Sequence, residues 1–481
     1  MCRHLLFLVF FSVIVDSTVD RVRGTEPADL PPDLRTRRTG SDWPGFLGPI
    51  GTSVSTEKGI LTPWPAGGLR LVWQRTTGLG YGMPSISRGR LFQFERHGDR
   101  ACLLCLKSET GDLLWRFEYP TQYEDLYGYD NGPRCCPVVD DNRVYIFGAE
   151  GMLHCLRVAD GKPLWKVDTK ETFGVVQNFF GVASVPVIEK DFLLVHVGGS
   201  PKGSTDEPFA DLKGNGSGLV AFDKRTGQVR YRVTDELASY AGPVLATIAG
   251  RRWCFLLARG GLIGLEPGTG RVDFHFPWRS PKLESVNASN PVVVGDRVFL
   301  SETYGPGSAL LRVQPGSFEV IWSDAGTRRK RMQCHWMTPI HHDGYLYGCS
   351  GRHTANAELR CLELASGKVM WSEPDLTRTS LLLVDDHLVC LGEDGILRLL
   401  RVNPRKYEEV SRLILRDPAR PESDPPLLLR YPCWAAPILA QGLLYVRGRD
   451  RLVCLELIPL GKRSRESFSP RGQSRPRYSR M

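Results

Sequence analysis

The chain has 481 residues, of which 42% are hydrophobic and 24% charged, so a folded core is expected and an intrinsically disordered chain is excluded. Its 50 Gly and 34 Pro supply many turns without the excess that marks low-complexity sequence. The formal net charge is +9, but residues 461–481 hold seven Lys or Arg against one Glu, so the rest of the chain is nearly neutral.

The first 24 residues are predicted to be a signal peptide. Leu5 to Val15 is an apolar run behind a short basic start, and it is too short to span a bilayer. A membrane anchor and a cytosolic start are the alternatives. The signal peptide predicts export to the periplasm or another extracytoplasmic compartment, with no transmembrane helix in the mature chain. Residues 25–63 then form a linker and an N-terminal segment, in which Asp42 to Gly48 is expected to cap the fold.

One unit of about 50 residues repeats along the chain: a proline, then short strands with alternating apolar residues, separated by Gly- and Asp-rich turns. The prolines are Pro84, Pro137, Pro186, Pro243, Pro291, Pro339 and Pro437. The last interval spans two units, which places an unmarked copy near Ser380. Eight copies of four strands predict an all-β fold, an eight-bladed β-propeller of four-stranded antiparallel blades over residues 64–460.

The copies end in a Gly followed four residues later by an aromatic residue, as in Gly111 to Trp115 and Gly227 to Tyr231. This ending resembles the tryptophan-docking repeat of the pyrroloquinoline-quinone (PQQ) type propellers, a family that includes quinoprotein dehydrogenases and the outer-membrane assembly factor BamB. The resemblance covers about residues 64–459. In two copies it is imperfect: Gly316 to Trp322 is longer, and the copy near Asn403 lacks both residues.

The two ends of the repeat region are complementary. The eighth copy stops without an outer strand, whereas the segment Leu69–Trp73 is an outer strand without a copy of its own. We therefore expect Leu69–Trp73 to complete the last blade and close the ring, which removes free sheet edges. Residues 461–481 are predicted to be a basic, disordered tail, with a contact to phosphate-rich surfaces as the alternative to a solvated tail and no nucleic-acid partner expected.

In a propeller, the connections between blades converge on one mouth of the central channel, which is the default ligand site. The predicted funnel residues are Tyr81, Asp130, Asn131, Arg134, Gln177, Asn178, Tyr240, Asn287, His335, Arg378 and Trp434. Asn residues beside Gly or Pro also cap turns, and aromatic residues also fill channel walls, so each is weighed against a structural role. Arg352 and His353 are expected on the rim or the opposite side, in solvent.

Some quinoprotein alcohol dehydrogenases carry a disulfide between adjacent cysteines beside the cofactor, and this resemblance implies such a bond between Cys135 and Cys136. Two small packing residues are the alternative. A quinoprotein also needs oxygen ligands for calcium and a carboxylate base. Asp130, Asn131, Asn178, Glu284 and Asn287 have the right chemistry, but no segment matches the dehydrogenase motifs and no metal site is predicted.

The resemblance therefore implies two functions. The first is a BamB-like, non-catalytic scaffold in the cell envelope that needs no cofactor and binds a protein partner or small ligand. The second is a dehydrogenase of alcohols or sugars that uses PQQ and calcium in the central funnel. No catalytic residue can be assigned from the sequence.

Overall fold

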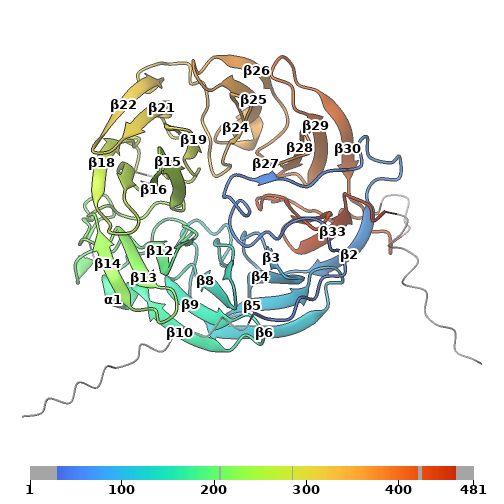
Figure 1. Cartoon of the computed structure of the whole chain (residues 1–481), viewed down its shortest axis with the longest axis horizontal. Coiled ribbons are helices and arrows are strands. Elements are labelled where there is room, and N and C mark those ends of the chain that lie inside the picture. The colour runs from blue at the N-terminus through green and yellow to red at the C-terminus, as the bar shows by residue number, and fades with distance from the viewer. Residues whose placement is uncertain (1–29, 205–206, 284, 421–424, 462–481) are drawn as a thin grey trace, which may run out of the picture.

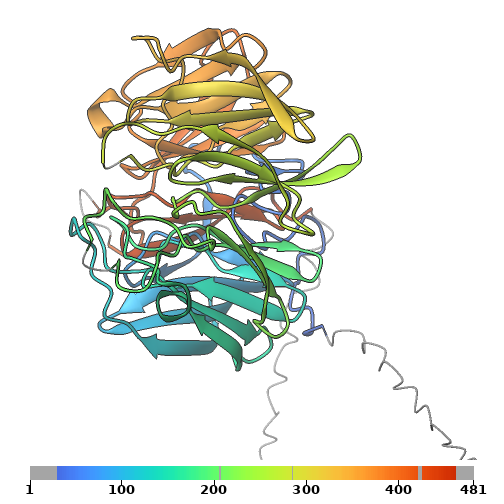
Figure 2. The same ribbon diagram turned by 90° about the vertical axis from the view of Figure 1, so that its left-hand side faces the viewer.

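The computed structural model describes residues 30–204, 207–283, 285–420 and 425–461. The predicted signal peptide, the basic tail from residue 462 onward and Glu284 lie outside these residues. Eight sheets form a ring (Figure 1), and each contains four antiparallel strands. The eight-bladed propeller predicted from the repeats is thus confirmed. Figure 2 shows the same ring from its side.

The blades are numbered here from the first proline of the repeat, and each starts at the strand nearest the channel. Blade 1 contains β3 (Ser85–Ser87), β4 (Arg90–His97), β5 (Arg100–Lys107) and β6 (Leu113–Pro120); blade 2 contains β7 (Val138–Asp140), β8 (Arg143–Phe147), β9 (Met152–Arg157) and β10 (Pro163–Asp168); blade 3 contains β11 (Val187–Glu189), β12 (Phe192–His196), β13 (Leu219–Asp223) and β14 (Val229–Val233); blade 4 contains β15 (Val244–Ile248), β16 (Arg251–Leu257), β17 (Gly261–Leu265) and β18 (Val272–Pro277).

The second half of the ring follows the same order. Blade 5 contains β19 (Val292–Val294), β20 (Arg297–Glu302), β21 (Gly307–Gln314) and β22 (Ser317–Ser323); blade 6 contains β23 (Ile340–His342), β24 (Tyr345–Ser350), β25 (Glu358–Glu363) and β26 (Val369–Glu373); blade 7 contains β27 (Thr379–Val384), β28 (His387–Gly392), β29 (Ile396–Arg401) and β30 (Glu409–Ile414); blade 8 contains β31 (Ile438–Ala440), β32 (Leu443–Arg447), β33 (Arg451–Glu456) and β2 (Arg70–Thr76). Among the described residues, the short helices α1 (Thr169–Phe173) and η2 (Thr354–Asn356) lie in connections.

The repeat prolines stand immediately before the innermost strand of seven blades, as with Pro137 before β7. The hairpin that follows turns through residues with positive φ, such as Asp141 (52°) and Asp343 (46°), which aspartate tolerates better than most residues. Blade 7 has no proline, and its first strand β27 covers Ser380, where the sequence placed the unmarked copy.

At five of the eight junctions, neighbouring blades are joined by an aromatic side chain laid on a glycine. A Cβ atom on Gly161 would lie 2.5 Å from the Trp115 ring, so only glycine allows this approach. Trp115 also donates its Nε1–H to Val158 O of blade 2 at 3.0 Å. Blade 7 has no aromatic residue in this place, and there Leu413 approaches Gly68 instead.

The ring is closed by strand β2, which pairs antiparallel with β33 as predicted. Trp73 of β2 is 9% exposed and donates Nε1–H to Ser108 O of blade 1 at 2.9 Å. Its ring lies against Gly111, where an added Cβ would meet it at 2.9 Å. The residue that completes blade 8 therefore also joins blade 8 to blade 1.

Residues 42–61, named here the N-terminal strap, run across one face of the ring. Trp43 is 1% exposed and exchanges two backbone hydrogen bonds with Ile86 of blade 1. Further on, β1 (Val54–Ser55) pairs in parallel with β27 and makes blade 7 five-stranded. The expected cap is present, but the parallel strand was not foreseen because two paired residues leave no pattern in the sequence.

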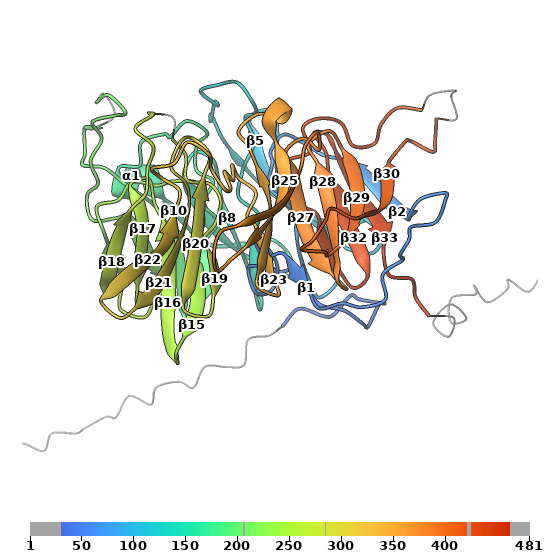
Figure 3. The same ribbon diagram turned by 90° about the horizontal axis from the view of Figure 1, so that it is seen from above.

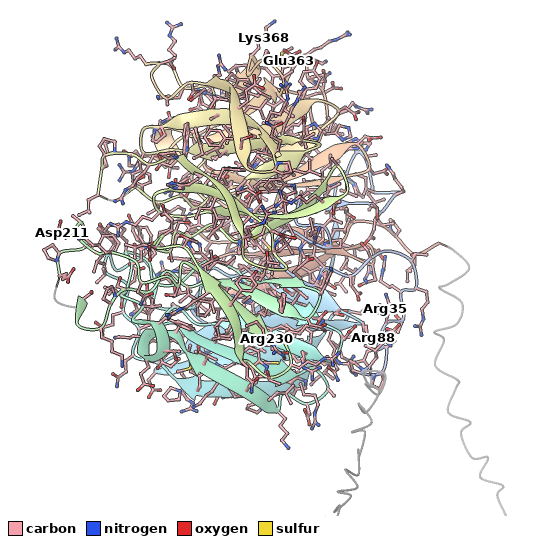
Figure 4. The ribbon with its side chains drawn as sticks, turned by 60° about the vertical axis from the view of Figure 1, so that its left-hand side comes forward. Arg35, Arg88, Asp211, Arg230, Glu363 and Lys368 are labelled. Atoms are coloured by element: carbon pink, nitrogen blue, oxygen red, sulfur yellow. The ribbon has the colours of Figure 1, made fainter. Side chains whose placement is uncertain are left out.

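The two faces of the ring differ. Figure 3 shows β1 on the lower face, while long connections, including η2, extend from the upper face. Figure 4 shows Asp211, in the polar excursion between β12 and β13, on the side away from Arg35 and Arg88, which both contact Asp42 of the strap. We call the upper face the funnel face. Within the described residues, no helix has the length and apolar character needed to cross a membrane.

Replacing Trp73 should test how strongly closure stabilises the ring. Trp73→Ala removes a buried ring and a hydrogen bond, so we expect the free energy of unfolding to fall by about 3–5 kcal/mol. Leu113→Ala is the matched control, because Leu113 is 48% exposed on an outer strand, and it should change stability by less than about 0.5 kcal/mol. Denaturant unfolding measures both, and a Trp73→Ala loss equal to that of the control would contradict a role in closure.

Candidate functional site

The connections before all eight blades surround one cavity of about 590 Å³ on the channel axis, named here the funnel cavity. Each blade contributes from the segment just before its first strand. Representative lining residues, in blade order, are Tyr81, Arg134, Phe180, Tyr240, Val286, His335, Arg378 and Trp434. The strap contributes Phe46 and Leu47, which close the cavity from the strap face. The channel is therefore a pocket open on the funnel face.

Trp434 is the centre of an aromatic cluster in this cavity. Its ring centroid lies 4.5 Å from that of Tyr81 and 5.3 Å from that of Trp336. Tyr129 and Tyr431 stand farther out, at 6.1 and 6.2 Å. Such tilted and edge-on arrangements leave ring faces and edges available to a ligand.

Arg378 is held beneath this cluster by a buried carboxylate. Glu393, at the end of β28, is fully buried and accepts from Arg378 Nε at 2.9 Å and Nη2 at 2.6 Å. The same carboxylate accepts from Trp434 Nε1 at 2.9 Å. Burial raises the pKa of Glu393, but these hydrogen bonds outweigh burial and hold its pKa below the ordinary value. One side chain thus fixes both a cation and the central aromatic residue.

Glu393 was not found by sequence reasoning. It precedes an Asp-Gly turn that reads as an ordinary hairpin loop, and its partner Arg378 lies fifteen residues earlier in the chain. The antiparallel pairing of β27 and β28, with Thr379 opposite Gly392, places the two residues side by side. This register was not worked out from the sequence, so the pair went unnoticed.

Arg134 is fixed in a similar way. Asp125 and Asp130 lie 2.5 and 3.6 Å from its guanidinium, and all three side chains are less than a tenth exposed. The guanidinium lies 4.9 Å from the centre of the Tyr81 ring. Asp130 and Asn131, which were predicted as funnel residues, are absent from the cavity wall: Asp130 also accepts from Gly132 N, and Asn131 accepts from Asp125 N. Both stabilise the loop that carries Arg134.

The position of Arg352 differs from the one expected from the sequence. It was expected in solvent, but it lines the funnel cavity with its guanidinium 4.2 Å from the centre of the Tyr304 ring. No carboxylate of the described residues lies within ion-pair distance of it. The turn of η2 after β24 folds this loop inward, which a polar loop sequence does not reveal. Arg352 is the cavity's cation without a protein counter-ion in the part of the chain that the structure describes.

His335 stands between these groups. Burial, with Arg378 and Arg352 nearby, lowers the pKa of His335 to about 3, so it is neutral at physiological pH. Its Nε2 lies 3.4 Å from the Tyr304 hydroxyl, and its ring packs on Trp336 with centroids 4.8 Å apart. A neutral imidazole adds a polar contact to the wall without adding charge.

The wall of the funnel cavity contains three arginines and, among the described residues, no Asp or Glu. The nearby carboxylates, Asp125, Asp130 and Glu393, are already engaged by Arg134 and Arg378. A calcium ion needs several oxygen ligands, mostly carboxylates. The residues present therefore do not fit a calcium ion in this cavity.

The residues whose chemistry would suit calcium do not come together either. Asn178 and Gln177 line a second, separate cavity of about 260 Å³. Asn287 lines neither cavity and donates to Ala258 O and Trp278 O at 2.7 and 3.0 Å. In the described part of the chain, no three His, Cys, Asp or Glu side chains form a group that could hold a metal ion.

Cys135 and Cys136 are free thiols in this structure, and both are buried. Cys135 Sγ lies 3.5 Å from Ser184 O of the next connection, whereas Cys136 lines the funnel cavity. Burial raises the pKa of Cys136 to about 12, so its reactive thiolate is scarce. The vicinal disulfide stays a prediction.

Comparison with known proteins gives a family and a fold. The family model described as "Outer membrane protein assembly factor BamB" matches residues 65–196 and 121–373. A quinohemoprotein alcohol dehydrogenase from Comamonas testosteroni is similar in structure, with a TM-score of 0.57 and 11% identity over 88% of this chain and 81% of that one. BamB from Moraxella catarrhalis has a TM-score of 0.53 and 12% identity over 81% and 97%. These identities show the fold alone. No curated protein sequence is significantly similar.

The Glu393–Arg378 pair should be sensitive to mutation and to pH. Glu393→Gln leaves a buried arginine without its counter-ion and should lower the free energy of unfolding by about 3–5 kcal/mol at pH 7. Because the folded-state pKa of Glu393 is depressed, its stabilisation is present above the ordinary value of 4.5 and is lost as the pH falls through the folded pKa. The difference between wild type and variant should therefore shrink in acid.

Denaturant unfolding at several pH values measures this difference. Glu319→Gln is the control, because the Glu319 side chain is 65% exposed and should contribute less than about 0.5 kcal/mol. A pH-independent difference would show that the charge of Glu393 does not stabilise the fold.

Thiol chemistry tests the state of Cys135 and Cys136. We expect Ellman's reagent to leave both unmodified in the native protein and to modify them after unfolding, because both side chains are buried. Mass spectrometry of the peptide containing them should give the mass of two thiols. A peptide lighter by two hydrogens would instead establish the disulfide.

Proposed function

This chain belongs to the PQQ-like repeat family of the outer membrane protein assembly factor BamB, and from this premise we propose that it is a non-catalytic binding propeller. Its funnel cavity receives an acidic group of a protein partner. The observation that supports this most directly is the composition of the wall, with three arginines, a cluster of aromatic rings and no carboxylate among the described residues. A cationic, partly apolar pocket favours an anionic group that also carries apolar surface.

The rim of the funnel supports a macromolecular partner. Tyr129 and Tyr431 line the cavity and are 60% and 52% exposed, and Leu126, in the same loop as Tyr129, is 63% exposed. Aromatic side chains with this exposure are typical of interface centres. A small ligand inside the cavity would leave these side chains in water, whereas a protein segment entering the funnel would cover them.

The three arginines differ in how strongly each could bind an incoming carboxylate. Arg134 and Arg378 are already paired with buried carboxylates, so they present part of each guanidinium in a fixed position. Arg352 has only Tyr304, through its ring and its hydroxyl, as a partner among the described side chains. An incoming carboxylate would therefore gain most from Arg352.

The alternative is a PQQ-dependent dehydrogenase. The reason to consider it is the fold shared with a quinohemoprotein alcohol dehydrogenase. PQQ is a flat quinone with carboxylates, and Trp434, Arg352 and Arg378 are suited to such a molecule. The calcium ion and the carboxylate base of that chemistry have no ligand or candidate in the wall, as described above. The binding function is therefore the better supported of the two.

The place of action follows from the predicted signal peptide. We propose that the protein is exported and works in the periplasm or another extracytoplasmic compartment, where an envelope protein would supply the acidic segment.

Peptide selection can test the proposed function without a known partner. A phage library of random peptides, selected on the immobilised protein, should enrich sequences that place Asp or Glu beside aromatic or aliphatic residues. For a selected peptide, Arg352→Gln should weaken binding by about tenfold or more, because a charge-assisted hydrogen bond is lost. Fluorescence anisotropy of the labelled peptide gives the dissociation constants.

Two results would contradict the proposal. Arg232→Gln is the matched control, since Arg232 is exposed on the outer strand β14, and an equal loss there would indicate non-specific charge attraction. Dye-linked oxidation of an alcohol after addition of PQQ and calcium, abolished in Trp434→Ala, would favour the dehydrogenase instead.

A further inference from the structure

A second cavity of about 260 Å³, named here the side cavity, lies beside the funnel between blades 2, 3 and 4. The segment from Val175 to Ser184 separates the two cavities, and in the described residues only Ala183 lines both. Gln122, Lys170 and Gln177 line the side cavity and are themselves exposed, so it opens to solvent. Its volume suits a molecule of a few heavy atoms.

Arg259 lines this cavity and is, among the described residues, a buried cation without a counter-ion. It is 5% exposed, and no carboxylate of the described residues lies within ion-pair distance. Its guanidinium stacks on the Phe209 ring at 3.7 Å and donates from Nη2 to Phe209 O at 3.1 Å, while Nε has no partner. The nearby carboxylate, Glu236, is used by His275 at 3.1 Å and by Gly260 N at 2.7 Å.

A buried charge without a partner is costly, so it calls for an explanation. Burial, together with Arg279, lowers the pKa of Arg259 to about 10, which leaves the guanidinium charged at neutral pH. An anion in the side cavity would supply the missing counter-ion.

His196 adds a hydrogen-bond acceptor to the same wall. It is 1% exposed, its Nδ1 lies 3.4 Å from Ala241 O, and its Nε2 has no partner. In the tautomer that donates from Nδ1 to Ala241 O, the lone pair of the neutral ring is on Nε2. The Ser200 hydroxyl, also 1% exposed and on the cavity wall, has no partner in the described residues either.

Glu150 limits the charge that this cavity accepts. It lines the wall, and its carboxyl is bonded by Tyr119 Oη at 2.7 Å and Thr121 Oγ1 at 3.1 Å. A second negative charge near this carboxyl would be repelled, and the other cation of the wall, Lys170, is exposed to solvent. A monoanion is therefore favoured over a dianion.

We infer that the side cavity binds a small monocarboxylic acid that bears a hydroxyl group, with the carboxylate paired to Arg259 and the hydroxyl donating to His196 Nε2. The assignment stands on the unpaired guanidinium, the free imidazole nitrogen and the cavity that joins them. It is independent of what the funnel binds.

Titration calorimetry of the full chain with glycolate tests the inference. Glycolate should bind with a dissociation constant of about 0.1–1 mM, in keeping with its few heavy atoms. Acetate, which lacks the hydroxyl, should bind about tenfold more weakly or worse, because the buried His196 nitrogen stays unpaired. The uncharged methyl ester of glycolate should not bind.

Variants locate the site. Arg259→Gln should abolish glycolate binding, whereas Arg352→Gln in the funnel and the exposed Arg232→Gln should leave it unchanged. If Arg259→Gln fails to fold, the affinities of wild-type protein for glycolate, acetate and the methyl ester of glycolate still test the inference. No heat with glycolate, equal affinity for acetate, or loss of binding in Arg352→Gln would each overturn the inference.

Discussion

An aromatic ring laid on a glycine, with its N–H or O–H bonded to a carbonyl of the next blade, is the contact on which the ring geometry depends. Trp115 on Gly161 and Trp165 on Gly227 repeat it between successive blades. Tyr231 makes the equivalent contact with Gly270 and Pro267 O. Each such contact fixes the angle between two sheets, because neither partner has room to shift. Five of the eight junctions have this contact. The closed ring brings eight connections to one axis, where the funnel cavity lies.

The sequence was informative where a signal repeats. The prolines and the Gly-aromatic endings predicted eight blades and the closing strand, because equivalent positions in the blades make the same contacts with the same types of residue. The position of the funnel followed from the topology, and Tyr81, Arg134, Tyr240, His335, Arg378 and Trp434 do line it.

The sequence was uninformative where a contact occurs once. Glu393 beneath Trp434 and Arg352 on Tyr304 join residues of different loops, and nothing in their local spacing marks them. Asp130 and Asn131 were predicted to line the funnel because they are polar residues shortly before a strand. Such residues can contact a ligand or stabilise a loop, and here they stabilise the loop. The strap residues Phe46 and Leu47 could not be assigned to the cavity because no repeat places them there.

The charged side chains of the funnel face follow one arrangement. Carboxylates lie behind the wall and arginines lie in it, so the positive ends of Arg134 and Arg378 are oriented before any ligand arrives. A pre-oriented cation loses little conformational freedom on binding, which favours selectivity for geometry over mere attraction of charge. Aromatic faces beside the guanidiniums lower the cost of keeping them out of water.

The join between the two ends of the propeller also bears on how the protein forms. Arg70 of β2 and Glu456 of β33 are 386 positions apart, and Arg37 and Leu61 likewise contact the segment around Glu456 and Leu457. Contacts of such sequence separation form slowly, since a long loop must be ordered first. Strand β2 and the end of the strap at Leu61 precede their blade 8 partners by almost the whole propeller, so they pair late. During folding, β2 therefore lacks its partner strand, and Trp73 lacks its neighbour Tyr445, until the final blade has formed. This interval is when the protein most needs protection from aggregation.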